Sequence, residues 1–125
     1  MPPKFKFTRD EITNAALNVT RKNGISGLTA RALAAELGCS VKPIFGLFKN
    51  MEEVGQEVFI ASDLLYQNYL REDMAKGKYS PYKASGMAYI RFAKEERELF
   101  KLLFMRDRSR EKIEENKEEI RPLMQ

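Results

Sequence analysis

The feature that most restricts the fold is a tight turn between two short helical segments, in the stretch LAAELGCSVKPIFGLFKN. Gly38 is expected to end the first helix, and Ser40 to open the second as its N-cap. Pro43 then falls in the first turn of the second helix, where backbone amides have no intrahelical partner. Ile44 and Phe48 lie four residues apart and are expected to face inward. Because a helix of two turns is unstable alone, we expect it to be docked on its neighbours with its outer face free.

The first helix has readable ends. Thr8 is placed to cap it, and Glu11, three residues later, is placed to bond back to the cap amide. Asn23-Gly24 supplies a left-handed stop. The apolar residues between them recur at the spacing of one helical face: Ile12, Ala15, Ala16 and Val19.

The same signals continue along the chain. Thr29 is expected to cap the helix that ends at Gly38, and the longest helix is expected over Asn50 to Lys76, stopped by Gly77. A further helix is expected after Ser80-Pro81, with serine as the cap and proline in the first turn. The buried face of the longest helix is expected at Val54, Val58, Ala61, Leu65 and Tyr69.

Strand-like alternation is absent, so the sequence predicts an all-α fold. The net charge of +4 is uneven: residues 1–50 carry eight Lys or Arg and three acidic residues, a net charge of +5, whereas residues 51–125 carry −1. We therefore expect a three-helix helix-turn-helix head in residues 1–50, joined by a long helix to a partial helical bundle, the body, in residues 51–125. A basic head on a near-neutral body is typical of a polyanion-binding module.

Missing residue types exclude much of enzyme chemistry. The chain has no histidine, which removes histidine acid–base catalysis, Ser–His and Cys–His nucleophile pairs and the commonest metal ligand. No glycine-rich phosphate loop is present, and Cys39 is the single cysteine, which fits a reducing cytoplasm. We predict a cytoplasmic non-enzyme without cofactor or membrane span. Carboxylate pairs such as Glu95 and Glu96 remain the catalytic alternative.

The segment TARALAAELGCSVKPIFGLFKNMEEV, Thr29 to Val54, resembles the DNA-binding region of TetR-family transcriptional regulators. Ala34 and Gly38 have the spacing of a helix-turn-helix, and Ser40 opens a helix that runs to IFGLF, similar to the apolar–aromatic–x–x–Phe ending of the family. FKNMEEV is similar to the entry into the family's long fourth helix. Tyr89 to Phe104 resembles, more loosely, the start of its ligand-binding half.

The resemblance implies a ligand-responsive regulator, a repressor that inserts the Ser40 to Phe48 helix into the major groove of a palindromic double-stranded DNA operator. The first turn of that helix would meet base edges and phosphates, Thr29 and Arg31 would touch the DNA backbone, and an N-terminal arm that includes Arg9 would add phosphate contacts. The implied DNA-binding residues are Thr29, Arg31, Ser40, Val41, Lys42, Pro43, Phe45, Leu47, Lys49, Lys4 and Lys6.

Three positions depart from the family pattern. Phe45 stands where a tyrosine is common, Leu47 where a histidine is frequent, and Met51 where a lysine is usual. Each change removes a polar DNA contact, although Lys49 is placed to supply the lost charge. The alternative function is therefore a degenerate helix-turn-helix that exposes Phe45, Leu47 and Met51 and binds a protein partner.

The aromatic and methionine residues of the body have two interpretations. They line a pocket for a small apolar effector, as the resemblance implies, or they are core. The candidates are Tyr66, Tyr69, Met87, Tyr89, Phe92, Phe100 and Phe104.

The end of the chain bears on assembly. Glu98 to Met105 is apolar nearly all round, so we expect other helices to surround it, whereas Arg106 to Glu119 is mostly polar. TetR-like regulators continue through further helices that form the dimer interface. We therefore expect this chain to be a shortened form of a protein that is a homodimer when intact, and to dimerise weakly or through Glu98 to Met105.

Overall fold

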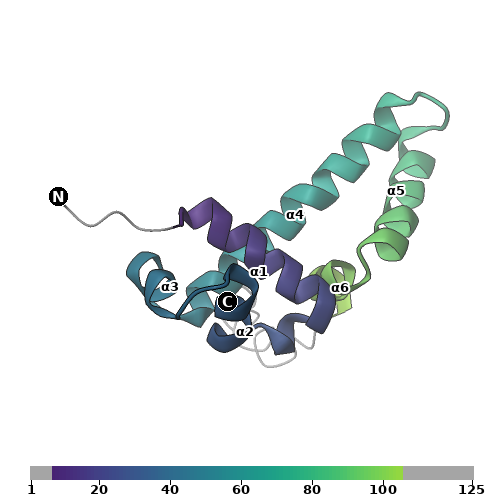
Figure 1. The fold of residues 1–125 in the computed structure, drawn as a ribbon. Coiled ribbons are helices and arrows are strands. Elements are labelled where there is room, and N and C mark those ends of the chain that lie inside the picture. The colour runs from purple at the N-terminus through teal and green to yellow at the C-terminus, as the bar shows by residue number, and fades with distance from the viewer. Residues whose placement is uncertain (1–6, 106–125) are drawn as a thin grey trace, which may run out of the picture.

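The computed structural model describes residues 7–105, which form helices and turns with no strand among them (Figure 1). The all-α prediction is therefore confirmed over this range. Predictions for Lys4, Lys6 and the tail from Arg106 lie outside the described residues. Among residues 7–105, no helix combines the length and apolarity needed to cross a bilayer. The elements in chain order are α1 (Arg9–Asn23), the 3-10 turn η1 (Ile25–Gly27), α2 (Ala30–Leu37), α3 (Lys42–Leu47), α4 (Met51–Ala75), α5 (Pro81–Glu95), α6 (Arg97–Phe100) and the π-helical turn η2 (Lys101–Met105).

The predicted ends of α1 are confirmed with one difference. The Thr8 hydroxyl accepts from the Glu11 amide at 3.1 Å, and the Glu11 carboxylate accepts from the Thr8 amide at 3.1 Å, which completes the capping box. Gly24 has the expected positive φ of 76°. Its ψ of 169° is extended, not left-handed helical, because the chain turns directly into η1.

The turn after α2 has the predicted geometry. Thr29 caps the helix by accepting from the Ala32 amide at 3.0 Å. Gly38 is left-handed, with φ 69° and ψ 37°. Its amide donates to the Ala35 carbonyl at 3.2 Å, and the amide of Cys39 donates to the Ala34 carbonyl at 3.0 Å. These two bonds form a Schellman motif, which satisfies the last carbonyls of α2 and reverses the chain within two residues.

The predicted start of α3 is wrong. Ser40 is not its N-cap, because the first intrahelical acceptor is the carbonyl of Val41, which binds the amides of Ile44 at 3.1 Å and Phe45 at 3.3 Å. Val41 itself is already near helical geometry, with φ −74° and ψ −14°. The chain needs two residues after the Schellman motif before it can turn into α3. Pro43 still lies in the first turn, as predicted.

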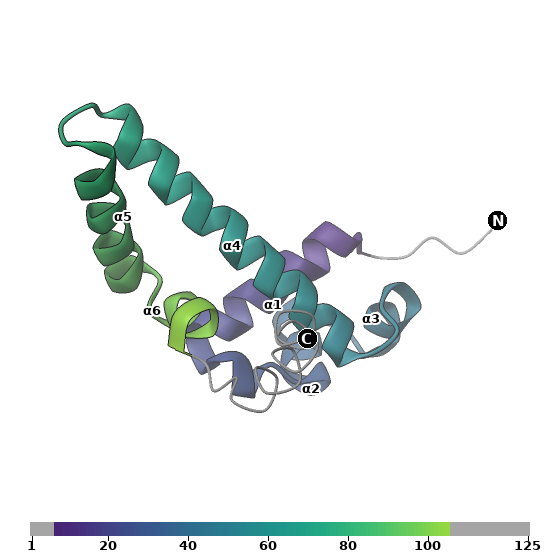
Figure 2. The same cartoon turned by 180° about the vertical axis from the view of Figure 1, so that it is seen from behind.

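α4 and α5 form a long antiparallel hairpin that extends away from the head and returns to it (Figures 1 and 2). The Asn50 side chain caps α4 by accepting from the Glu53 amide at 2.9 Å, and Gly77, with φ 62°, follows its end. Ser80 caps α5 by accepting from the Lys83 amide at 3.3 Å. The hairpin thus brings α6 beside α1, as both views show.

One apolar core runs through head and body. Ile12 of α1 and Leu33 of α2 share it with Ile44 of α3, Val54 of α4 and Phe92 of α5, all fully buried. The predicted division at residue 50 falls at the cap of α4, and the core continues across it because the first turns of α4 pack on α1. The head is therefore fixed to the long helix by shared side chains.

Burial along α4 differs slightly from the sequence expectation. Val54, Val58 and Tyr69 are buried as predicted, but Ala61 and Leu65 are half-buried. The helix buries Ser62 instead, whose hydroxyl donates to the Val58 carbonyl at 2.7 Å. A serine is tolerated there because the helix itself satisfies its only donor.

The expectation that other helices enclose Glu98 to Met105 is wrong for the residues that the structure describes. Leu99 and Leu102 are buried, but Phe104 and Met105 are exposed. The segment is one α-helical turn followed by the π-helical η2, and it packs one side against α1, α4 and α5. Its other side remains open to solvent.

Candidate nucleic-acid interface

α3 is held by its inner face. Ile44 and Phe48, one turn apart, are both buried in the common core, and the Phe48 amide donates to the Ile44 carbonyl at 2.8 Å. Val41, Lys42 and Phe45 are exposed. The short helix is thus docked as the sequence predicted, with a free outer face of mixed apolar and basic character.

Arg9 joins the end of α3 to α1 and α4. Its guanidinium carbon lies 4.2 Å from the centroid of the Phe48 ring, and it donates to the carbonyl of Leu47. The same guanidinium binds Glu53 of α4 at 3.1 Å and Glu57 at 3.6 Å. Arg9 was expected on the DNA-contacting arm, but here its charge is occupied within the protein. Its partners lie about forty residues away in sequence, so no local pattern indicated them.

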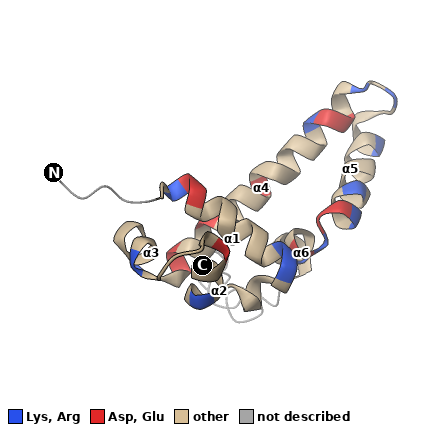
Figure 3. Ribbon diagram, viewed as in Figure 1, with Lys and Arg blue, Asp and Glu red and all other residues tan. Residues whose placement is uncertain are grey.

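Three basic residues near the turn are left unpaired. In the described part of the chain, Arg31, Lys42 and Lys49 are exposed and form no ion pair. Some acidic residues of the head and of the start of α4 are paired internally, since Lys22 binds Glu36 at 2.9 Å and Arg9 binds Glu53 and Glu57. Figure 3 shows the resulting basic positions on α2 and α3, at the end of the molecule away from the α4–α5 loop. These three cations are therefore available to an external anion.

The other predicted DNA-binding residues have different surroundings. Thr29 and Ser40 are exposed, although the Thr29 hydroxyl already accepts from the Ala32 amide as a helix cap. Pro43 is half-buried. Leu47 is half-buried and packs against the core, so only part of its side chain is accessible. The structure therefore brings most of the predicted set to one end of the head.

The exposed patch expected for a protein-binding alternative is not formed as predicted. Leu47 and Met51 both pack against the core, because α3 and the first turn of α4 close over the end of α1. Phe45 is exposed, as expected. The exposed large apolar side chains at α3 are therefore those of its N-cap Val41 and of Phe45.

The aromatic residues of the body pack on one another. Tyr66 lies with its ring centroid 5.2 Å from Phe92, and Tyr89 lies 4.9 Å from Phe100. An open groove of about 460 Å³ runs along α5 and is also lined by Tyr66 of α4. Of the seven predicted pocket residues, the groove is lined by Tyr66, Met87 and Tyr89. Its other lining residues are Tyr82, Lys83, Ser85, Gly86 and Ile90.

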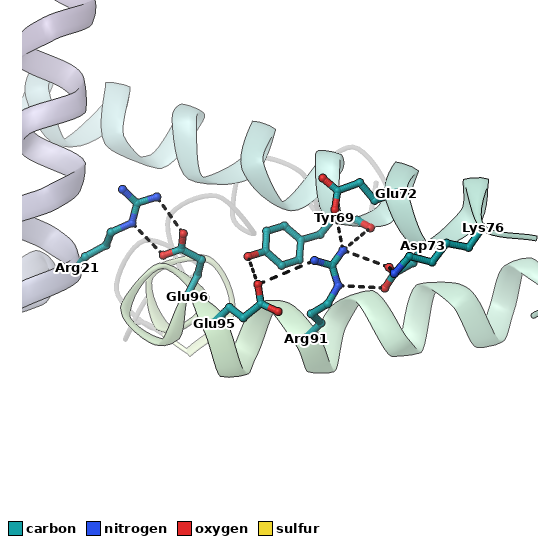
Figure 4. A network of polar contacts seen from close by, with 8 residues as sticks. All are labelled: Arg21, Tyr69, Glu72, Asp73, Lys76, Arg91, Glu95 and Glu96. Atoms are coloured by element: carbon teal, nitrogen blue, oxygen red, sulfur yellow. Dashed lines mark hydrogen bonds and ion pairs between the residues drawn. The ribbon is translucent and has the colours of Figure 1, made fainter. Parts of the chain in front are cut away.

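A network of ion pairs holds α5 to α4 (Figure 4). Arg91 binds Asp73 at 3.1 Å and Glu72 at 3.0 Å, and its guanidinium lies 4.2 Å from the centroid of the Tyr69 ring. Lys76 binds Asp73 at 3.1 Å. Burial alone would raise the pKa of Asp73, but hydrogen bonds from Lys76 and Arg91 outweigh burial and lower it. This carboxylate therefore remains ionised inside the hairpin.

The two carboxylates at the corner between α5 and α6 point to different partners (Figure 4). Glu95 accepts from the Tyr69 hydroxyl at 3.0 Å, and burial together with this bond raises the pKa of Tyr69 to about 12. Glu96 accepts twice from Arg21 of α1, at 2.9 Å each, and these bonds raise the pKa of Arg21. The pair named as a catalytic alternative thus serves two separate structural contacts. Arg21 is 75 residues from Glu96, so the sequence carried no local signal for this bridge.

No group of His, Cys, Asp and Glu side chains within residues 7–105 could hold a metal ion. Comparisons with protein-family models, curated proteins and solved structures return no match for the chain. The functional argument therefore depends on the chemistry of the head itself.

Proposed function

We propose that this protein is a ligand-responsive DNA-binding transcriptional regulator, a repressor that contacts a palindromic operator through α3 and the start of α2. One observation carries the proposal. α3 is fixed by two buried side chains, while Arg31, Lys42 and Lys49 near it are exposed and form no ion pair among residues 7–105. Such cations contribute affinity for phosphates without internal cost, since no carboxylate must be released first.

The regulatory part of the proposal concerns the body. A small apolar effector would bind the groove on α5, whose volume of about 460 Å³ lies in the range of small-molecule sites and whose walls include Tyr66, Met87 and Tyr89. Binding of the effector in this groove would lower the affinity of the protein for DNA. The regulator would act as a homodimer, because a two-fold protein matches a palindromic site.

The test is DNA binding by the 125-residue chain, measured by fluorescence anisotropy on duplexes that the protein has selected from a random library. Three phosphate contacts predict a loss of affinity of about 40-fold between about 50 and about 200 mM salt for one bound subunit, and six contacts predict a loss of about 2,000-fold for a bound dimer. The matched control is Lys94→Ala, an exposed lysine on α5 far from α3. It should bind like the parent.

Two further measurements complete the test. Lys42→Ala and Lys49→Ala should each weaken binding and flatten its dependence on salt, by about one unit of the log–log slope. If both variants bind like the parent and like Lys94→Ala, α3 is not the DNA-contacting surface and the proposal fails.

A further inference from the structure

The end of the α4–α5 hairpin exposes aromatic rings. Tyr82, in the first turn of α5, is 91% exposed, the highest value among the large apolar and aromatic side chains of residues 7–105. Tyr79, just before that helix, is 40% exposed. Both lie where the hairpin extends farthest from the head (Figure 1). The core does not account for two rings in this position.

Lysines lie among these rings. Residues 74–87 include three lysines and no acidic residue. The Nζ atom of Lys83 lies 4.6 Å from the centroid of the Tyr79 ring. Within the described part of the chain, Lys78 and Lys83 form no ion pair. Positive charge and exposed aromatic surface therefore occur together here.

Two hollows show that these side chains belong to one surface. Tyr79 and Lys78 line a hollow of about 200 Å³ together with Met87. Tyr82 and Lys83 line the groove of about 460 Å³ together with the same Met87. The two sets of side chains therefore adjoin at this methionine. We call their surface the hairpin tip, which consists of Lys76, Lys78, Tyr79, Tyr82, Lys83 and Met87.

The acidic residues nearest the hairpin tip already have cationic partners. Arg91 binds Glu72 at 3.0 Å and Asp73 at 3.1 Å, and Lys76 also binds Asp73 at 3.1 Å. Lys78 remains exposed beside them. The hairpin tip therefore offers cations to an anion outside the protein.

A partner that fits the hairpin tip must be anionic and must also accept aromatic rings. Tyrosine has an apolar ring and a polar hydroxyl, and it is enriched where a lipid bilayer meets water. Lysine stems lie along apolar surface while their ammonium groups reach polar headgroups. Single-stranded nucleic acid requires a basic groove that follows its backbone. The groove beside Tyr82 has Lys83 as its single charged lining residue, so a bilayer surface fits better than a strand.

We propose that the hairpin tip docks this protein on an anionic phospholipid bilayer. The Tyr82 ring lies at the level of the headgroups, and Lys78 and Lys83 contact lipid phosphates. The inference is independent of DNA binding by the head, because α3 lies at the end of the molecule away from this loop (Figure 3).

A tryptophan at the hairpin tip tests the contact, because the chain itself has no tryptophan. The full chain with Tyr82→Trp is mixed with vesicles of phosphatidylglycerol and phosphatidylcholine in equal parts. Its emission should shift to shorter wavelength and become protected from acrylamide, since the indole leaves water. Vesicles of phosphatidylcholine alone should change neither. Phe45→Trp, on the exposed side of α3, is the matched control and should keep its emission with both kinds of vesicle.

Lysine variants test the charge. Sedimentation with the same anionic vesicles measures the partition coefficient. Lys78→Ala and Lys83→Ala should each lower it about fivefold, the equivalent of about 1 kcal/mol for one lysine at an anionic membrane surface. Lys94→Ala, an exposed lysine near the other end of α5, should bind like the parent. Because all three lysines are exposed, the variants should keep the melting temperature of the parent, measured by circular dichroism.

Three results would overturn the inference. Unchanged emission of Tyr82→Trp with anionic vesicles removes the docking site. A shift in Phe45→Trp and not in Tyr82→Trp assigns vesicle binding to the head. A shift in Tyr82→Trp that a single-stranded oligonucleotide produces and anionic vesicles do not produce assigns the hairpin tip to nucleic acid. None of these results decides the proposed function, which has its own test in the salt dependence of DNA binding.

Discussion

The cations nearest α3 and two cations of the α4–α5 hairpin have different surroundings. In the head, α3 is held by apolar side chains and by Arg9. Within residues 7–105, the exposed Arg31, Lys42 and Lys49 near it form no ion pair. In the body, Arg91 and Lys76 are bound to carboxylates of the same hairpin. A cation paired inside a hairpin is a structural element, whereas an exposed unpaired group beside a rigid helix is available to an external anion. The difference therefore separates the charges that are paired within the fold from those that the proposed function assigns to DNA binding.

The largest effect is expected where the head depends on its apolar contacts. Phe48→Ala removes a buried ring that also carries the Arg9 guanidinium, and should lower the free energy of unfolding by about 3–5 kcal/mol. Phe45→Ala, on the exposed side of the same helix, should change it by less than about 0.5 kcal/mol. Urea denaturation measures both. If both variants lower the free energy of unfolding by the same amount, the side of α3 that carries Phe48 is not the side that packs on the core.

The turn before α3 provides the second test. Gly38→Val forces a β-branched residue into a left-handed conformation, at a cost of about 1–3 kcal/mol. No atom lies within 4 Å of the position that a Cβ would take, so the cost is conformational and not steric. Gly38→Asn should therefore be tolerated much better, since asparagine enters this region more readily. If Gly38→Val has the same melting temperature as the parent, Gly38 is not in the left-handed conformation of a Schellman turn.

The body should respond through its charges. Arg91→Met leaves the buried carboxylate of Asp73 with Lys76 alone and should cost about 1–2 kcal/mol near pH 7, less than a fully buried pair because the arginine is partly exposed. The pKa of Asp73 is lowered in the folded state, so its stabilisation is present above the ordinary carboxyl pKa and is lost as pH falls through the folded value. The difference between parent and variant should accordingly shrink in acid.

The control for this prediction is Arg71→Met, an exposed arginine of α4 that bonds to Asn68. It should leave thermal stability nearly unchanged at either pH. If Arg91→Met and Arg71→Met behave alike, the ion-pair network does not stabilise the hairpin.

The smallest effect is expected at the corner between α5 and α6. Tyr69→Phe deletes the bond to Glu95 and should cost about 0.5–1.5 kcal/mol. Because the pKa of Tyr69 is raised to about 12, the phenol stabilises the fold below its ordinary pKa and loses this contribution as pH rises towards 12. In an alkaline absorbance titration, the variant should lack the tyrosinate signal that appears near pH 12 in the parent. If the variant keeps the full tyrosinate signal near pH 12, the raised pKa belongs to a tyrosine other than Tyr69.

Local chemistry could be predicted from the sequence, and contacts between distant segments could not. The Thr8–Glu11 capping box and the glycine turn at Gly38 each depend on residues within a few positions, and both are confirmed. The start of α3 was misplaced because the Val41 carbonyl, and not the Ser40 side chain, begins the helix. A residue that is a good N-cap in sequence does not fix the helix start, because the helix can begin at a neighbouring residue that fits the preceding turn better.

The candidate site shows the same limit. The exposure of Lys42 and Lys49 followed from their place on the helix-turn-helix. The burial of Leu47 and the internal use of Arg9 did not, because both depend on how α4 packs over α1 and α3. The family resemblance placed Arg9 among the residues expected to contact DNA. Only tertiary contacts separate paired from unpaired cations.

The central claim is that the unpaired cations around α3 are the DNA-contacting charges of this protein. It is tested most directly by the slope of log affinity against log salt concentration for the parent and for the triple variant Arg31→Ala/Lys42→Ala/Lys49→Ala. Loss of three phosphate contacts should reduce the magnitude of the slope by about 2.7 for each subunit bound. A triple variant with the slope and affinity of the parent would contradict the account.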